Sequence, residues 1–140
     1  MASGSSATES SNTLYLARIT IPSAGGGGTV PITGIAVGNG ASAVGNATVA
    51  LFNSAGNQVA VSSSIANSTT YEAQFYPFTA VYNASPGVYA IGVIYSGAAT
   101  VCQVSPLGQC SVQSQGSYTM PSSISPLGIA SHYVPAMATY

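Results

Sequence analysis

Val88-Tyr89-Ala90-Ile91-Gly92-Val93-Ile94-Tyr95 is the segment that decides the fold class of this chain. Side chains alternate between the two faces of a strand, and both sets that this alternation defines are apolar or small. A short apolar run of this length, rich in β-branched and aromatic residues, is typical of a strand covered on both sides. The segment therefore predicts a central strand of a sheet.

Further strand-like segments lie on both sides of this strand, separated by turns rich in Gly, Asn, Ser and Pro. Several short strands at intervals of about 8–12 residues predict an all-β fold, either an antiparallel β-sandwich or a jelly-roll-like barrel. The predicted strands are 14–21, 29–37, 47–52, 58–61, 71–82 and a weaker one at 111–120. The predicted core contains Ile35, Leu51, Phe78, Ile91 and Ile94.

The chain has 140 residues, a length that suits one domain. Residues 1–13 are small and polar and have no periodicity, so we expect a flexible N-terminal arm. We expect the β-sandwich domain over 14–120 and an extended, proline-containing tail over 121–140. Pro77 interrupts the aromatic-rich segment 71–82 and predicts an edge, a bend or a bulge there.

Charge is almost absent from the sequence. Glu9, Arg18 and Glu72 are the residues charged at neutral pH, whereas 46% of the residues are apolar. An ordinary soluble domain is about one-quarter charged. A surface with almost no net charge lacks the repulsion that keeps monomers apart, so it favours association. One arginine cannot neutralise a series of phosphates, so neither nucleic acid nor an anionic membrane is an expected partner.

The same scarcity of ionisable groups argues against catalysis. Paired carboxylates would have to come from Glu9 and Glu72, and a serine triad would have to use His132 as its base. Glu9 lies in the expected arm, and Glu72 is better explained as a solvated strand residue. Two cysteines and one distant histidine leave a zinc site incomplete. We therefore expect no enzymatic activity, no catalytic or cofactor-binding residues, no metal site and no cofactor.

Cys102 and Cys110 are the two cysteines, and Ser105-Pro106-Leu107-Gly108 between them is typical of a turn. Their thiols could meet across a short hairpin, where a disulfide would contribute about 2–3 kcal/mol in the loop-entropy model. Two reduced, partly buried thiols are the alternative. The sequence predicts the bridge if the final environment is oxidising.

Aromatic residues and glycosylation sequons are the remaining features with a functional interpretation. The chain has nine Tyr and three Phe. We expect most of these rings in the core, with a subunit interface or a ligand platform as the alternatives. Sequons occur at Asn46, Asn67 and Asn83, and can arise by chance in a chain so rich in Asn, Ser and Thr.

Five pieces of the chain carry a family resemblance through their order. They are TVPITGI (29–35), VALFNSAG (49–56), PFTAVY (77–82), PGVYAIGVIY (86–95) and PLGIAS (126–131). Together they resemble a family of small phage virion proteins, which occur as capsid decoration proteins or as domains of head and tail fibres. The resemblance runs from about Leu14 to Tyr140, nearly the whole chain.

This resemblance implies a virion surface protein that forms homo-oligomers, commonly trimers. Its implied partners are the major capsid protein or neighbouring subunits, and it carries over no catalytic residues. The loop at Cys102–Cys110 and the scarcity of charge depart from the family pattern. Shell decoration, fibre segment and major coat therefore stay open as roles.

The expected function is that of a virion structural protein, assembled in the host cytoplasm, which decorates or cements a phage capsid or forms part of a fibre. In this role the arm 1–13 or the tail 121–140 would dock onto neighbouring subunits or the capsid. One alternative is a pilus-like surface filament subunit that uses strand addition. Another is a carbohydrate-binding, receptor-recognition module that uses exposed tyrosines.

Overall fold

The computed structural model describes residues 6–23, 25–104, 110–125 and 134–140. Within these ranges the chain forms strands and turns, and none of it is helical. Antiparallel sheets pack against each other, so the fold is a β-sandwich and not a closed barrel. The prediction of an all-β fold is confirmed, and of the two predicted architectures the sandwich is the one that forms.

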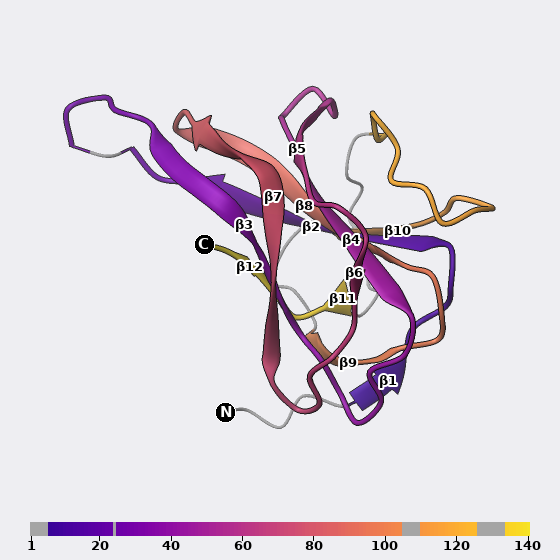
Figure 1. Ribbon diagram of the computed structural model, residues 1–140. Coiled ribbons are helices and arrows are strands. Elements are labelled where there is room, and N and C mark those ends of the chain that lie inside the picture. The colour runs from indigo at the N-terminus through magenta and orange to yellow at the C-terminus, as the bar shows by residue number, and fades with distance from the viewer. Residues whose placement is uncertain (1–5, 24, 105–109, 126–133) are drawn as a thin grey trace.

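The described residues form strands that are numbered in chain order in Figure 1. Most are short, and the longest has 12 residues. The strands are β1 (Ser6–Thr8), β2 (Thr13–Ile21), β3 (Val30–Gly38), β4 (Asn46–Phe52), β5 (Gln58–Val61), β6 (Ile65–Ala66), β7 (Ala73–Ala84), β8 (Gly87–Tyr95), β9 (Thr100–Val104), β10 (Cys110–Ser114), β11 (Val134–Pro135) and β12 (Met137–Thr139).

β8 lies in the middle of the largest sheet, whose order is β10-β2-β8-β4-β5, with β6 also paired to β4. Every residue of β8 from Tyr89 to Tyr95 is buried. Gly92 leaves the space that a neighbouring side chain needs, because a Cβ atom there would lie 2.8 Å from the Leu16 side chain. The predicted central strand, covered on both faces, is confirmed.

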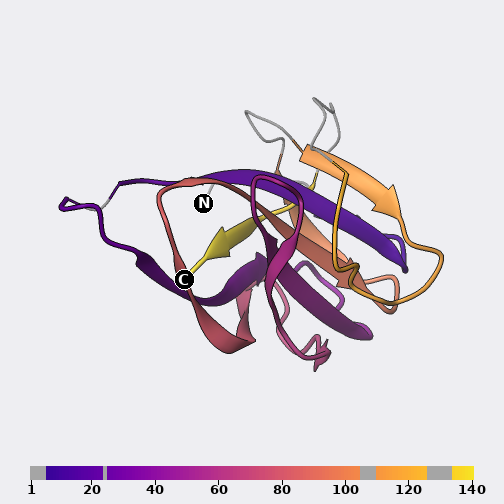
Figure 2. The ribbon, with the colours of Figure 1, turned by 90° about the horizontal axis from the view of Figure 1, so that it is seen from above.

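The opposing layer is a three-stranded sheet with the order β12-β3-β7. In Figure 2 this layer lies below the layer that contains β2 and β10. The register between β3 and β7 shifts between Ile32 and Gly34, and Gly34 lies opposite Pro77. Because proline cannot donate to the ladder, the irregularity that the sequence predicts at Pro77 occurs where the register changes. A further small sheet, β1-β9-β11, has β1 and β9 at one end of the sandwich (Figure 1).

Apolar clusters lie on both faces of the largest sheet. The larger cluster fills the space between the two layers, and the smaller one lies on the other face of β2, β8 and β4. The five residues of the sequence-derived core are all buried, with at most 8% of their surface exposed: Ile35, Leu51, Phe78, Ile91 and Ile94. Ile94 is the member of this set that lies in the smaller cluster.

The loop that follows β10, residues 115–125, covers the smaller cluster from outside. Its residues Tyr118, Met120 and Ile124 pack against that cluster. The Ile124 N–H donates to the Gly56 carbonyl at 2.8 Å, and the Gln58 side chain donates to the Pro121 carbonyl at 2.9 Å. These bonds join the loop to the β4–β5 hairpin, which explains how β8 can be buried on both faces.

Both ends of the described chain are paired into sheets. β1 pairs with β9, and the Glu9 N–H donates to the Ala99 carbonyl at 2.8 Å. β12 pairs with β3, and the Tyr140 N–H donates to the Gly34 carbonyl at 3.2 Å. Strand structure thus reaches into segments that we expected to be a flexible arm and an extended tail. Each end finds backbone partners on a strand that is remote in sequence.

Candidate interaction surface

The ionisable side chains considered for catalysis lie on different elements. Glu9 is buried between β1 and β2, with 3% of its surface exposed, whereas Glu72 is exposed just before β7. Burial, and then a hydrogen bond with the Glu9 side chain, raises the pKa of Tyr15 to about 12. His132 lies outside the described residues. Glu9 is therefore in contact with a tyrosine inside the fold.

A buried network of neutral polar side chains holds the connection between β6 and β7. The Asn39 amide donates to Gln74 Oε1 at 2.9 Å and to Thr69 Oγ1 at 3.0 Å. The Tyr76 hydroxyl donates to Asn67 Oδ1 at 2.6 Å, and burial raises the pKa of Tyr76 to about 12. These groups are neutral amides and hydroxyls, and the Gln74 and Asn67 amides also donate to the Ala66 and Val44 carbonyls, each at 2.8 Å. Among the described residues Asn39 Oδ1 has no hydrogen-bond partner. The network therefore belongs to the framework of the fold.

The cysteines lie on strands of different sheets. Cys102 is on β9, which pairs with β1 and β11, and Cys110 is on β10, which pairs with β2. In the described residues β9 and β10 pair with other strands and not with each other, whereas the expected turn at residues 105–108 lies outside the described residues. The Cys102 Sγ is a free thiol that lies 3.6 Å from the Asn39 carbonyl oxygen, and Cys110 is buried. A disulfide in an oxidising environment stays a prediction.

The three sequon asparagines differ in accessibility. Asn67 has 8% of its surface exposed, and its side-chain amide donates to the Val44 carbonyl at 2.8 Å. Asn46 donates to Ser64 Oγ at 3.0 Å. Asn83 is exposed on β7. A glycan on Asn67 would therefore require the fold to open.

Some of the described aromatic rings are buried and others are exposed, among them Tyr71, which precedes β7 and is 68% exposed. Six described rings are buried: Tyr15, Phe52, Tyr76, Phe78, Tyr89 and Tyr95. Phe75 and Tyr140 are 59% and 39% exposed, and their rings form a T-shaped pair with centroids 5.1 Å apart. This pair joins the end of the chain to β7.

Phe75 and Tyr140 belong to the outward-facing side of the β12-β3-β7 sheet. Ala36 of β3 lies opposite Phe75 on one side and Ala138 on the other, so these three residues share a face. Gly38 lies opposite Ala73 in the same way. We call this surface the outer face, which consists of Ala36, Gly38, Ala73, Phe75, Ala136, Ala138 and Tyr140. None of its side chains is charged.

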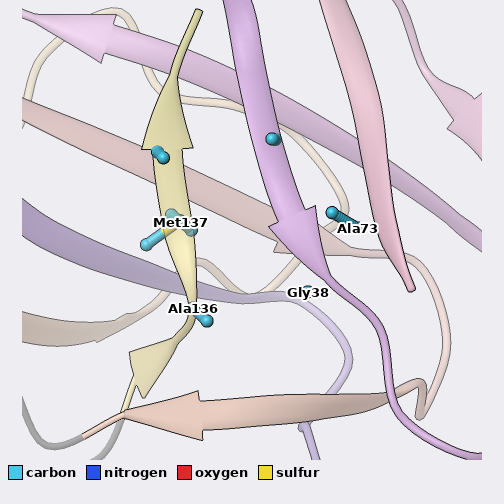
Figure 3. Close-up of a pocket in the computed structure, with 6 residues that line it drawn as sticks. Gly38, Ala73, Ala136 and Met137 are labelled. Atoms are coloured by element: carbon cyan, nitrogen blue, oxygen red, sulfur yellow. The ribbon is translucent and has the colours of Figure 1, made fainter. Parts of the chain in front are cut away.

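The outer face contains a shallow hollow beside Phe75. Its volume is about 220 Å³, and Figure 3 shows the residues that line it. They are Ala36, Gly38, Ala73, Ala136, Met137 and Ala138. Because these residues are small or apolar, the hollow offers van der Waals contact and no side-chain hydrogen bonds.

The exposed side of β7 does not follow from the sequence pattern. Ala73, Phe75 and Pro77 are exposed and alternate with buried Gln74 and Tyr76. A period of two predicts a strand, but it would place the apolar Phe75 in the core and the polar Gln74 in solvent. The contribution of β12 has no such signal, because it depends on pairing between opposite ends of the chain.

In the parts of the chain that the structure describes, no group of three or more His, Cys, Asp or Glu side chains is placed to hold a metal ion. No helix in these parts is long and apolar enough to cross a membrane. Comparisons with protein-family models, with curated proteins and with solved structures gave no match.

Proposed function

We propose that this chain is a virion structural protein that decorates or cements a phage capsid, or forms part of a fibre, through protein–protein contacts and without catalysis. The observation that carries the proposal is the outer face. Phe75, at 59% exposure, and Tyr140, at 39%, stand there beside small apolar residues. Contiguous apolar surface on a rigid sandwich is typical of an interaction site.

The charge of the chain supports the same proposal. Two acidic residues and one basic residue give a formal net charge of −1 at pH 7. Such a surface suits close packing of many copies, because neighbouring copies do not repel each other strongly. The choice of a virion rests on the resemblance of the five ordered pieces, and the proposed partners are the major capsid protein and further copies of the chain.

The test is to isolate assembled particles from cells that produce the chain and to search for it by mass spectrometry and cryo-EM. We expect the chain to co-sediment with the particles and to give density of this sandwich, repeated over the shell or along a fibre. Recovery of the chain only in fractions that contain no particles would contradict the proposal.

A filament subunit is the second candidate, favoured by the position of β12. This three-residue strand lies at an end of the order β12-β3-β7, so in the described pairings its backbone is bonded on one side. Such an edge can accept a strand from another molecule. Open helical polymers of the purified protein, seen by negative-stain electron microscopy, would favour this candidate over the virion role.

A further inference from the structure

We propose that the outer face pairs with the outer face of a second copy of this chain about a two-fold axis, with the Phe75 ring of each copy seated in the hollow of the other. This inference rests on the proposed function, which includes self-association. It names the surface, the anchoring residue and the symmetry of the contact.

Phe75 has the properties of an anchor. Its neighbours on β7, Gln74 and Tyr76, are buried, so the strand alternation directs Phe75 outward, where 59% of its surface is exposed. Its edge-on contact with Tyr140, with an interplanar angle of 89°, holds the ring in place. A ring that is already ordered loses little conformational freedom on binding, which favours association.

The hollow has the size and chemistry that a phenyl ring requires. Its volume is about 220 Å³, and its lining consists of Ala, Gly and Met residues. A closed apolar cavity of about 150 Å³ is known to accept benzene. The open hollow therefore has room for one ring, which would cover apolar surface on both partners. A sugar is a poorer occupant, since the lining side chains offer it no hydrogen bonds.

The position of the ring beside the hollow selects a second copy as the occupant. Ala36, which lines the hollow, is directly opposite Phe75, and Ala73 lies two residues before Phe75 on the same face. A two-fold axis between ring and hollow superimposes each ring on the partner's hollow at once. This reciprocity is the defining property of an isologous contact.

The absence of charged side chains on the outer face is compatible with the two-fold contact. No side chain of the outer face is charged, so two copies can meet there without burying or opposing charged side chains. Glu72, which precedes Ala73, is exposed and lies beyond the strand end. It is placed at the rim of the contact, where its carboxylate can stay in water. The outer face thus combines a projecting ring with an apolar hollow and carries no charged side chain.

The experiment measures the mass of the purified chain by light scattering and its dissociation constant by sedimentation equilibrium. Phe75→Asp removes the ring and places a charge in the contact, and Ala138→Trp fills the hollow without adding charge. Val112→Asp, at a residue 38% exposed on β10 of the other sheet, is the matched control. Thermal unfolding by circular dichroism verifies that each variant is folded.

We expect a wild-type dimer whose dissociation constant rises about tenfold or more in Phe75→Asp and in Ala138→Trp, since aromatic anchors dominate such contacts. The control should leave the constant nearly unchanged. A wild-type monomer, a trimer, or a dimer that Phe75→Asp does not weaken would overturn the inference.

Incorporation into particles, measured separately, distinguishes this inference from the proposed function. A wild-type chain that is monomeric or trimeric in solution but present in particles would overturn the two-fold contact alone. A dimer that is lost in Phe75→Asp supports the contact, even if the chain is absent from particles and the virion role fails.

Discussion

The hydroxyl groups of two buried tyrosines, Tyr76 and Tyr95, differ in their hydrogen bonding. The Tyr76 hydroxyl donates to Asn67 Oδ1 at 2.6 Å. Tyr95 has no exposed surface, and among the described residues its hydroxyl has no hydrogen-bond partner. A paired buried group contributes about 1 kcal/mol to stability, whereas an unpaired one costs about 1–3 kcal/mol. The two hydroxyls therefore act on the stability of the fold with opposite sign.

Removing each hydroxyl tests this difference. We expect Tyr76→Phe to lower the free energy of unfolding by about 1–3 kcal/mol, because Asn67 Oδ1 loses its donor inside the fold. Tyr95→Phe keeps the ring and removes an unpaired group, so its free energy of unfolding should stay the same or increase. Urea unfolding measures both. An equal loss in the two variants would show that the Tyr95 hydroxyl is hydrogen-bonded in solution.

At the scale of single elements, Gly34 is a point of close approach in the β12-β3-β7 sheet. A Cβ atom on Gly34 would collide with the backbone carbonyl oxygen of Tyr76 on β7 and would lie 2.7 Å from the Tyr140 ring beyond β12. The absence of a Cβ atom at Gly34 is therefore a condition for β3 to pair on both sides. The bulge near Pro77 depends on the same position.

Gly34→Ala should weaken this sheet as a unit. Because a backbone atom is in the way, the strands must shift, and overpacking of this kind costs about 1–3 kcal/mol. Urea unfolding gives the loss of stability, and amide hydrogen exchange at Tyr140 reports whether the end of the chain detaches. Gly28→Ala is the control, since no atom lies within 4 Å of its added methyl group. Equal stability of the two variants would refute the close approach.

A strand could be predicted from the sequence where its own residues carry a hydrophobic pattern, and not where it depends on pairing with a remote segment. The central position of β8 in the sheet could be predicted from its own sequence, since both alternating sets of side chains are apolar or small. β1 and β12 have three residues each and no apolar pattern, so only their partners β9 and β3 define them. The outer face was hidden for the same reason, because its hollow combines β3, β7 and β12. Pairing between remote segments also determines the partners of β9 and β10, which in the described residues are other strands and not each other.

For the molecule as a whole, tyrosine is the main ionisable residue. The chain has nine tyrosines and three residues that are charged at neutral pH. Burial, with a smaller effect of the hydrogen bond to Glu9, raises the pKa of Tyr15 to about 12, and burial raises that of Tyr76 to about 12. Burial also raises the pKa of Tyr95 well above its usual value. Stability should therefore depend on pH mainly at the alkaline end.

Whether stability rises or falls with pH depends on whether the folded or the unfolded chain keeps its tyrosine protons to higher pH. An unfolded tyrosine ionises near pH 10, whereas Tyr15 and Tyr76 in the fold keep their protons to about pH 12. Below about pH 10 both states are protonated and stability is complete. As the pH rises from about 10 to about 12, the unfolded chain gains free energy by ionising, and stability falls by about 1.4 kcal/mol per pH unit for each such group.

Urea unfolding between about pH 8 and pH 12, with tyrosinate absorbance recorded in parallel, measures this loss. We expect a steep decrease in the free energy of unfolding above about pH 10, together with tyrosinate formation that coincides with unfolding. Tyr76→Phe should show a shallower decrease, since it has one fewer buried hydroxyl to ionise. A free energy of unfolding that stays constant up to about pH 12 would mean that these hydroxyls ionise equally in both states, and that the fold does not protect them.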